Sequence, residues 1–321
     1  MHAIICPAYG PPEVLQQAER PMLQVKPDTL LVRIHATAAT SADARVRAAD
    51  FPAGMGWMAR LAFGLKRPRN PILGGVFAGE IAEVGKGVTG FSPGERVFGM
   101  TGARLGCYAE YQTVKATGAV AKLPDAICFT DAAALPFGFT TAIGFLRDKA
   151  KLKTGETLLV IGASGDVGSA AVQIGKQLGA HVTAVCSAAN AAKVTDIGAD
   201  AVVDYRTVDP FDGQHKYDVV IDTIGKNPAL QVMKAVAPRG RLALVAGGLR
   251  DMLRRSGPER QKVLSGVAAE RADDLDMVAG WVSAGAYKPV IDQVFPLDNI
   301  VDAHRLVATG RKVGAAVVVI G

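Results

Sequence analysis

Three glycines at intervals of three residues mark the segment 162–168, which reads Gly-Ala-Ser-Gly-Asp-Val-Gly. Small residues let a backbone come close to a pyrophosphate, and the start of a helix offers unpaired N–H groups and a partial positive charge. The apolar residues 158–161 suit a buried parallel strand, and residues 169–178 suit a helix. Because strand, turn and helix follow in this order, the segment predicts a dinucleotide site; the alternative is an ordinary strand–turn–helix without a ligand.

The length and composition of the chain indicate a globular protein of two domains. Its 321 residues suffice for two separate cores, and 49% hydrophobic and 21% charged residues are ordinary values. There is no run of eighteen apolar residues, so no membrane span is predicted. The N-terminus lacks the basic start and the long apolar stretch of a signal peptide. We therefore expect a cytoplasmic protein with no membrane partner.

The formal net charge of +6 raises the question of a nucleic-acid partner. Part of the excess lies in segments 60–69 and 250–255, which we expect to be surface loops. Neither segment interleaves aromatic with basic residues, and no nucleic-acid-binding motif accompanies them. The charge is therefore assigned to a solvated face that could serve an anionic phosphate cofactor, and no nucleic acid is predicted as a partner.

The four cysteines are scattered, and no two of them have C-x-x-C spacing. This excludes a zinc knuckle and gives no disulfide framework in a chain of this length. Reduced thiols are the expectation, with Cys186 a small packing residue at the end of a strand. The five histidines show no catalytic grouping, and none is assigned a role.

The pattern of elements changes near Pro124. Before it, strand-like segments broken by Gly and Pro predict a partly open all-β unit, with short helices beginning at Ser41 and near Met55. After it, strands and helices alternate, which predicts a parallel sheet covered on both faces; Thr130 would cap the first helix. The expected strands are 30–35, 79–84, 95–98, 157–161, 181–186, 201–203, 217–222 and 240–246, and the expected helices between the later ones are 167–178, 189–197 and 227–236.

The end of the chain is expected to return to the first domain, through a last strand at 315–320. Before that strand we expect a mobile loop or short helix at 249–268, a helix at 271–284, a strand at 290–295 and a helix at 298–309. The predicted domains are residues 1–123 together with 286–321, and residues 124–285.

Further motifs occur in order on both sides of the glycine segment. They are Gly74-Gly-Val-Phe-Ala-Gly79-Glu-Ile-Ala-Glu-Val-Gly85, Gly94-Glu-Arg-Val-Phe-Gly99, Ala134-Leu-Pro-Phe-Gly-Phe-Thr-Thr141-Ala, Leu178-Gly-Ala180, Gly198-Ala-Asp200 with Asp204-Tyr205, and Gly310-Arg-Lys-Val-Gly314. With them the chain resembles, over nearly its whole length, the zinc-free quinone oxidoreductase-like branch of the medium-chain dehydrogenase/reductases. The resemblance implies an α/β fold, with a Rossmann doubly wound parallel sheet and a GroES-like partly open β-barrel catalytic domain. It also implies a homodimer, for which an edge strand at 240–246 could pair across a two-fold axis.

The residue types at the family's metal positions argue against zinc. Relatives with a catalytic zinc place Cys, His and Cys where this chain has Thr40, Gly75 and Phe137, none of which is a usual zinc ligand. The structural zinc loop with four closely spaced cysteines is also missing, and only Cys107 lies nearby. We therefore expect no metal.

Hydride transfer without a Lewis acid is the reaction that the resemblance then implies. A quinone or a conjugated enone suits such a site, because its ring or β-carbon accepts hydride readily and the developing oxygen charge needs only hydrogen-bond donors. We expect an NADPH-dependent reductase of small hydrophobic quinones or α,β-unsaturated carbonyl compounds. The alternatives are a metal-free NADP-dependent alcohol or aldehyde reductase, and a non-catalytic NADPH-binding protein that senses redox state.

The preference for NADPH over NADH depends on the end of the second Rossmann strand. An acid there would hold the ribose 2′-hydroxyl of NAD, but residues 187–190 contain none. Ser187 could hydrogen-bond a 2′-phosphate, and Lys193 and Tyr205 lie at or near positions that help to bind it in similar reductases. Related sequences often carry Arg where Ala189 stands, so the grip is expected to be weaker here.

The remaining site residues also follow from the resemblance. Thr40, Asp43 and Phe51 are candidates for the substrate cleft, although Asp43 could simply cap a short helix. Phe51, Met55, Trp57 and Met58 are expected either to form an apolar lid over a hydrophobic substrate or to pack in the core. Asp166 replaces the usual Gly, and it would disfavour a pyrophosphate unless it points to solvent and caps the following helix. Thr141 is expected beside the nicotinamide or as an ordinary helix residue. The expected cofactor-binding residues are Thr141, Gly162, Ala163, Ser164, Gly165, Asp166, Val167, Gly168, Ser187, Lys193, Tyr205 and Ala246.

Overall fold

The computed structural model describes residues 1–254 and 256–321, which form two compact units. The first unit comprises Met1–Phe51, Gly56–Phe137 and Glu270–Gly321, and the second comprises Pro52–Met55 and Gly138–Ala269. Each unit contains its own large sheet and its own hydrophobic core. Among the described residues, no helix is long and apolar enough to cross a membrane.

The second unit is built on six parallel strands. They are β8 (Thr157–Ile161), β9 (His181–Cys186), β10 (Ala201–Asp204), β11 (Tyr217–Asp222), β12 (Val236–Leu244) and β13 (Lys262–Leu264). They pair in the order β10-β9-β8-β11-β12-β13. Four of the five residues of β8 are buried, as expected of a strand covered on both faces. This sheet confirms the predicted Rossmann-type fold.

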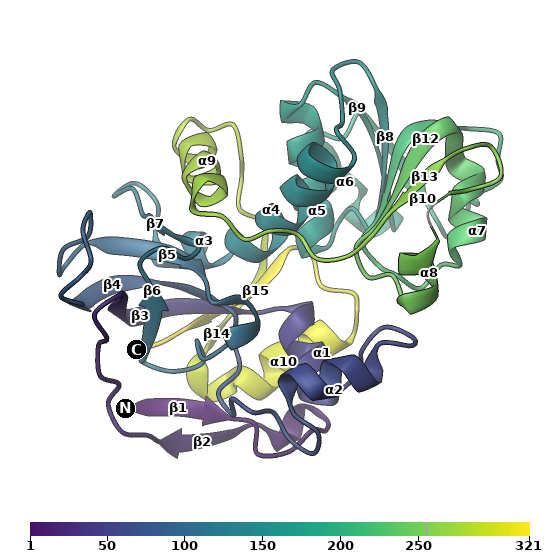
Figure 1. Cartoon of the computed structure of the whole chain (residues 1–321). Helices are drawn as coiled ribbons and strands as arrows, with labels where there is room; N and C mark the ends of the chain where they lie inside the picture. Colours follow the sequence, from purple (N-terminus) through teal and green to yellow (C-terminus); the bar gives the residue numbers. More distant parts are fainter. Residues whose placement is uncertain (255) are drawn as a thin grey trace. The chain divides into compact units, whose positions relative to one another are not determined.

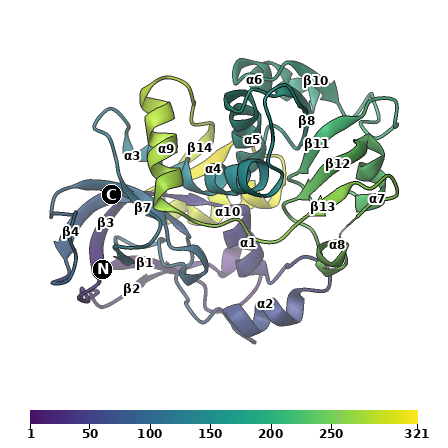
Figure 2. The same cartoon turned by 45° about the horizontal axis from the view of Figure 1, so that its top comes forward.

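Helices cover both faces of the parallel sheet. They are α4 (Pro136–Ile143), the π-helix η3 (Gly144–Lys149), α5 (Asp166–Gln177), η4 (Ala188–Asn190), α6 (Ala191–Asp196), α7 (Ala229–Val232), η5 (Met233–Ala235) and α8 (Leu249–Leu253). Figure 1 and Figure 2 both show α5 and α6 on one side of the sheet and α7 on the other. The core between them includes Leu159, Val220, Val232 and Leu242.

The first unit is built on a sheet in which β3 is central. The strands of the first unit are β1 (His2–Ile5), β2 (Gln16–Glu19), β3 (Thr29–Ala39), β4 (Val76–Val84), β5 (Arg96–Met100), β6 (Tyr111–Lys115), β7 (Val120–Lys122), β14 (Ile291–Pro296) and β15 (Ala315–Val319). The sheet order is β14-β15-β3-β4-β5-β7, with β6 on β3, and β1 and β2 form a separate pair. The last strand, β15, pairs antiparallel with β3, so the end of the chain returns to the first sheet as predicted.

The helices of the first unit have nine residues or fewer, except α9, which has twelve. They are η1 (Pro12–Val14), α1 (Ser41–Ala48), α2 (Gly56–Phe63), η2 (Gly102–Arg104), α3 (Phe129–Ala133), α9 (Ala272–Ser283), η6 (Leu297–Asn299) and α10 (Ile300–Ala308). The division between the units falls after residues 137 and 269, whereas the sequence placed it after 123 and 285. The physical reason is packing: α3 lies against β3 and β4, and α9 lies against β5 and β7.

Three local predictions were wrong. The strand expected at 240–246 is β12, which lies between β11 and β13 and is therefore not an edge strand. Thr130 is not the cap of α3, because the helix begins one residue earlier and the Cys128 sulfur accepts from the Asp131 N–H at 3.4 Å. The basic segments are not loops throughout, since Arg60 lies in α2 and Arg250 in α8; Arg255 lies outside the described residues.

Candidate functional site

The glycine segment 162–168 forms the turn between β8 and α5. A β-carbon at Gly168 would collide with the carbonyl oxygen of Gly162 and lie 2.8 Å from the Ala163 Cα. Gly162 has a φ of 78°, a left-handed conformation that favours glycine. These two glycines therefore allow the helix to start directly on the end of the strand.

Gly165, the N-cap residue of α5, has open space around it. Its φ of −75° and ψ of 176° suit any residue. A β-carbon there would have one atom of the described residues within 4 Å, the Gly162 oxygen at 3.4 Å. Packing therefore does not explain the glycine, whereas a phosphate lying against the backbone would. The first N–H groups of α5 have no acceptor within the helix, so this cradle fits a pyrophosphate.

Asp166 is the first residue of α5, and Gly165 rather than Asp166 is the cap. Its carboxylate faces α4, where a β-carbon on Gly138 would collide with Asp166 Oδ1. The expectation that Asp166 caps the helix was therefore wrong. In the first turn its charge still interacts favourably with the helix dipole.

The ends of β9 and β10 bring two of the predicted phosphate-binding residues together. Asp204 pairs with Cys186 in the register, so Ser187 and Tyr205 directly follow the ends of two neighbouring strands. Tyr205 is 54% exposed, and Lys193 is exposed on α6. The residues that follow β9 and β10 and those of α6 thus include a hydroxyl, a phenol and a cation. The position after β9 is held by Ser187 and not by an acidic residue.

Asn190 is a contact that the sequence did not reveal. Its Nδ2 donates to Ser164 Oγ at 3.1 Å and so ties the glycine segment to the residues after β9. This bond links the predicted pyrophosphate and 2′-phosphate positions through protein atoms.

The turn after β11 was also missed. Asp222 is buried, and its Oδ1 accepts from the N–H groups of Ile224 at 2.9 Å and Gly225 at 3.1 Å. Burial raises the pKa of this carboxyl group. A β-carbon on Gly225 would lie 2.6 Å from the Ala246 Cβ, so the predicted residue Ala246 packs directly against this turn. The carboxyl ends of β8, β9, β11 and β12 thus meet at one edge of the sheet, where ligands of such sheets bind.

Thr141 lies on α4, one helical turn after the Gly138 that contacts Asp166. It therefore belongs to the same unit as the glycine segment. The expected substrate-cleft residues Thr40, Asp43 and Phe51 belong to the first unit.

Thr40 and Asp43 form a capping box at the start of α1. Thr40 Oγ1 donates to Asp43 Oδ2 at 2.6 Å and accepts from the Asp43 N–H at 3.1 Å, and the Thr40 N–H donates to the same carboxylate at 3.0 Å. Both side chains are buried. Phe51 stacks on Phe63 with 5.9 Å between ring centroids and packs against the core. The capping and packing alternatives for Asp43 and Phe51 are thus observed.

A buried chain of hydrogen bonds continues from Asp43. Arg47 Nε donates to His304 Nδ1 at 3.2 Å, so the ring proton of His304 lies on Nε2, which is 3.0 Å from the Tyr108 hydroxyl. Tyr108 in turn bonds to Asp43. Burial, and then the nearby Arg47, lower the pKa of His304 from 6.5 to about 3, and burial raises the pKa values of Asp43 and Tyr108.

The buried His304 makes the stability of the protein sensitive to acid. The unfolded chain binds the histidine proton near pH 6.5 and the folded protein only near pH 3, so acid favours unfolding over this range. We expect the free energy of unfolding to fall by about 2 kcal/mol through this group between pH 7.5 and pH 5. Urea unfolding at the two pH values measures this fall.

The control for this prediction is His304→Gln, which can still accept from Arg47 and donate to Tyr108. The variant should lose about 2 kcal/mol of the acid-induced fall. The raised pKa of Asp43 has the opposite effect on stability, since it destabilises the folded protein as pH rises. This contribution is the same in both proteins, so it cancels when their free energies of unfolding are compared. An equal fall in both proteins would contradict the role of His304.

Of the three residues expected at the family's metal positions, Thr40, Gly75 and Phe137, Thr40 is engaged in the cap of α1. Nearby, Cys107 is buried and its sulfur lies 3.6 Å from Thr101 Oγ1; burial raises the pKa of its thiol to about 12. Within residues 1–254 and 256–321, no three His, Cys, Asp or Glu side chains gather as a metal site would require.

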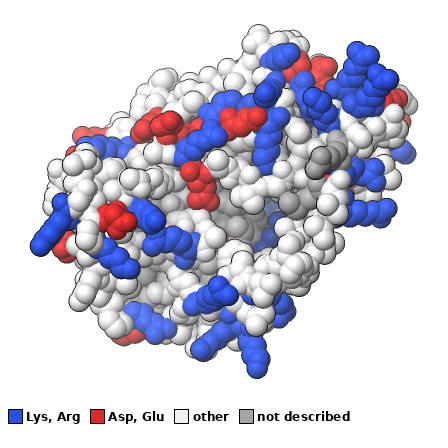
Figure 3. All heavy atoms as spheres, viewed as in Figure 1, with Lys and Arg blue, Asp and Glu red and all other residues white. Residues whose placement is uncertain are grey.

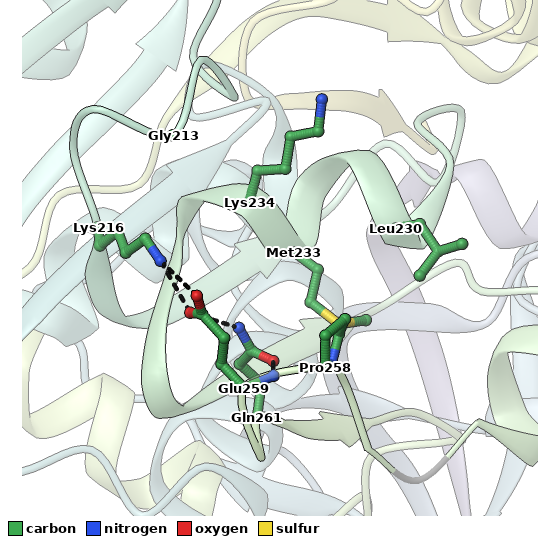
Figure 4. Close-up of a pocket in the computed structure, with 8 residues that line it drawn as sticks. All are labelled: Gly213, Lys216, Leu230, Met233, Lys234, Pro258, Glu259 and Gln261. Carbon is green, nitrogen blue, oxygen red and sulfur yellow. Dashed lines mark hydrogen bonds and ion pairs between the residues drawn. The ribbon is translucent and has the colours of Figure 1, made fainter.

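A cavity of about 290 Å³ lies at the amino ends of the parallel strands, beside the starts of β11, β12 and β13 (Figure 4). Lys216 Nζ bonds to both Glu259 carboxylate oxygens at 2.8 and 3.0 Å, and Gln261 bonds to Glu259 at 3.3 Å. Its charged groups thus largely satisfy one another. It is separate from the glycine segment and contains none of the predicted site residues.

Two domain families match this chain. Residues 26–125 match the alcohol dehydrogenase GroES-like domain, and residues 197–318 match a family described as zinc-binding dehydrogenase.

Individual proteins match over almost the whole chain. The mitochondrial NAD(P)H oxidoreductase RTN4IP1 of Mus musculus is 30% identical over 365 residues, covering 99% of this chain and 89% of the relative. The 2-methylene-furan-3-one reductase of Solanum lycopersicum is 29% identical over 322 residues, covering 97% and 76%. The solved quinone oxidoreductase of Coxiella burnetii superposes with a TM-score of 0.90 at 25% identity, covering 100% of this chain and 99% of that one.

Proposed function

The chain belongs to the medium-chain dehydrogenase/reductase superfamily, in its quinone oxidoreductase-like branch, and on this premise we propose that it reduces quinones or α,β-unsaturated carbonyl compounds with NADPH and without a metal. The observation that carries the proposal is the open cradle at Gly165, together with Ser187 in place of an acid at the end of β9. Relatives named as a furanone reductase and a quinone oxidoreductase support the substrate class.

The proposed roles of the cofactor-binding residues follow from their chemistry. When bound, NADPH would supply the hydride. The N–H groups at the start of α5 would hold the pyrophosphate, and Gly165 would let it approach the backbone. Ser187, Tyr205 and Lys193 would offer the 2′-phosphate two hydroxyl groups and one cation.

An electron-poor substrate carbon is proposed because the two polar residues expected in the substrate cleft, Thr40 and Asp43, are engaged with each other. The Thr40 hydroxyl and the Asp43 carboxylate are buried and bonded to each other in the cap of α1, so both are engaged in holding the fold. A quinone or a conjugated enone needs the least help, since the charge that develops is delocalised onto an oxygen that hydrogen bonds can stabilise. A simple ketone would need more.

A substrate panel tests the proposal. Protein treated with a chelator should oxidise NADPH rapidly when a small quinone or enone is added, and hardly at all with a simple ketone. Rapid oxidation of simple alcohols with NADP would favour the metal-free alcohol or aldehyde reductase instead. Tight NADPH binding without turnover on any compound would favour a non-catalytic redox-sensing protein.

We also propose that the protein is a homodimer and that it is located in the cytoplasm. With β12 inside the sheet, the edge strands of this sheet are β10 and β13, and either could pair across a two-fold axis.

A further inference from the structure

Helix α2 and the loop after it carry exposed apolar side chains in the first unit. Trp57 is 64% exposed, Leu61 51% and Leu65 64%. Trp57 and Leu61 are four residues apart and lie on one face of α2. Large exposed apolar side chains that gather on one surface are typical of a contact with a ligand, a protein or a membrane. Residues 56–69 are called the α2 surface below.

The α2 surface is also basic. It contains four exposed basic residues, and the sequence has no acidic residue from position 51 to position 79. The four are Arg60, Lys66, Arg67 and Arg69. Figure 3 shows blue atoms among white ones in the region where Figure 1 draws α2. Exposed apolar side chains and positive charges thus occur in the same segment of the chain.

The inner side of the α2 surface is fixed to the first unit. Phe63 stacks on Phe51, and its carbonyl oxygen accepts from the Arg69 N–H at 2.6 Å. The Tyr9 hydroxyl donates to the Gly64 carbonyl oxygen at 2.7 Å. Because these contacts hold the inner side, the exposed apolar side chains cannot turn inward without breaking them.

We propose that the α2 surface docks the protein on an anionic phospholipid bilayer. Trp and Leu side chains enter the boundary between headgroups and acyl chains, while Lys and Arg side chains attract anionic headgroups. Trp57 is suited to this boundary because its ring is apolar and its indole N–H is polar.

A bilayer is favoured over a second copy of the chain by the charge. In a two-fold contact, the α2 surface would meet an identical surface, and its four cations would face four others with no acid from the same segment to pair them. An anionic bilayer complements both the charge and the apolar groups.

The proposal goes beyond the reaction and does not depend on it. The sequence argued against a membrane partner because it contains no run of eighteen apolar residues, but docking at the surface needs no spanning segment. It adds a partner that the site residues do not reveal.

Vesicle sedimentation tests the docking. The whole chain should bind vesicles of phosphatidylglycerol and phosphatidylcholine at low salt, and bind pure phosphatidylcholine at least tenfold more weakly. Lys66→Glu with Arg67→Glu should lower binding by more than tenfold, because each basic residue contributes roughly a fivefold factor near an anionic surface. Trp57→Ser with Leu61→Ser should also lower binding.

Matched controls separate docking through the α2 surface from the effects of net charge and of nonspecific hydrophobic binding. Lys86→Glu with Lys115→Glu makes the same charge change at exposed lysines of the first unit, and Met22→Ser removes an apolar side chain that is 54% exposed. Both controls should bind like the unchanged protein. Turnover of a water-soluble quinone, measured in the same preparations, reports on the proposed reaction separately.

The fluorescence of Trp57 gives a second readout. The chain has two tryptophans, so Trp281→Phe leaves Trp57 as the only one. Its emission should shift to shorter wavelength on adding anionic vesicles and be quenched by lipids brominated on the acyl chain. Binding that is unchanged in the α2 variants, equally weakened in the controls, or equally strong on neutral vesicles would overturn the proposal. An α2-dependent dimer without vesicle binding would do the same.

Discussion

Replacing Gly165 with alanine should lower the affinity for NADPH at least tenfold while changing the free energy of unfolding by less than about 1 kcal/mol. A methyl group at this position meets no obstacle in the protein, since its nearest neighbour is the Gly162 oxygen at 3.4 Å. It would instead occupy the space in which a pyrophosphate reaches the backbone. Calorimetric titration with NADPH and urea unfolding measure the two quantities.

Gly168→Ala provides the opposite case in the same turn. Its methyl group would collide with the Gly162 carbonyl oxygen, so strand and helix must move apart. We expect a loss of about 2–4 kcal/mol in the free energy of unfolding, together with loss of NADPH binding. Gly280→Ala in α9 is the control, because nothing lies within 4 Å of its β-carbon. It should leave binding unchanged and stabilise the protein by up to about 1 kcal/mol.

These three variants separate a cofactor cradle from a plain turn. If Gly165→Ala bound NADPH as tightly as the unchanged protein, the open space at Gly165 would have no cofactor role. If Gly165→Ala and Gly168→Ala lowered the free energy of unfolding equally, the claim that a methyl group fits at position 165 but not at position 168 would be wrong.

Ser187→Asp should reverse the preference for NADPH. A carboxylate at the end of β9 would repel a 2′-phosphate, and at about 4 Å the repulsion is of the order of a few kcal/mol, which lowers kcat/KM with NADPH roughly 100-fold or more. With NADH the same carboxylate can accept from the ribose 2′-hydroxyl, so kcat/KM should hold or rise. Initial rates with a common quinone measure both.

The control for Ser187→Asp is Thr195→Asp, which adds the same charge at an exposed position of α6. It should leave the NADPH to NADH ratio nearly unchanged. Equal losses with both cofactors in Ser187→Asp would indicate damage to the fold. An unchanged protein that used NADH as well as NADPH would contradict the assignment of Ser187, Lys193 and Tyr205.

The parallel strands were the most predictable part of the fold. Strands 157–161, 181–186 and 217–222 were predicted with the bounds of β8, β9 and β11, because each is a short apolar run bounded by turn residues. The strand β13 was not, since three residues carry no period and its backbone becomes a strand through pairing with β12. Its presence turned the expected edge strand into an interior one.

The cap of α3 could not be chosen from sequence. Thr130 has the usual chemistry of a cap, whereas Cys128 is an uncommon one, and tertiary packing fixed the start of the helix.

Candidate site residues were predictable where the signal is local. The pattern of the glycine segment 162–168 predicts its turn from seven consecutive residues. Asp222 with Gly225 also leaves a local signal, an acid at a strand end before a glycine, which Asx turns favour. The chain from Arg47 through His304 and Tyr108 to Asp43 leaves none, because residues up to 257 positions apart meet only after folding.

The most direct test of the proposed reaction is the transfer of deuterium from NADPH labelled at C4 to an enone, by protein treated with a chelator. The proposed hydride transfer predicts that one of the two C4 epimers delivers one deuterium to the β-carbon of the product. Product without deuterium from either epimer, or no product until zinc is added back, would contradict it.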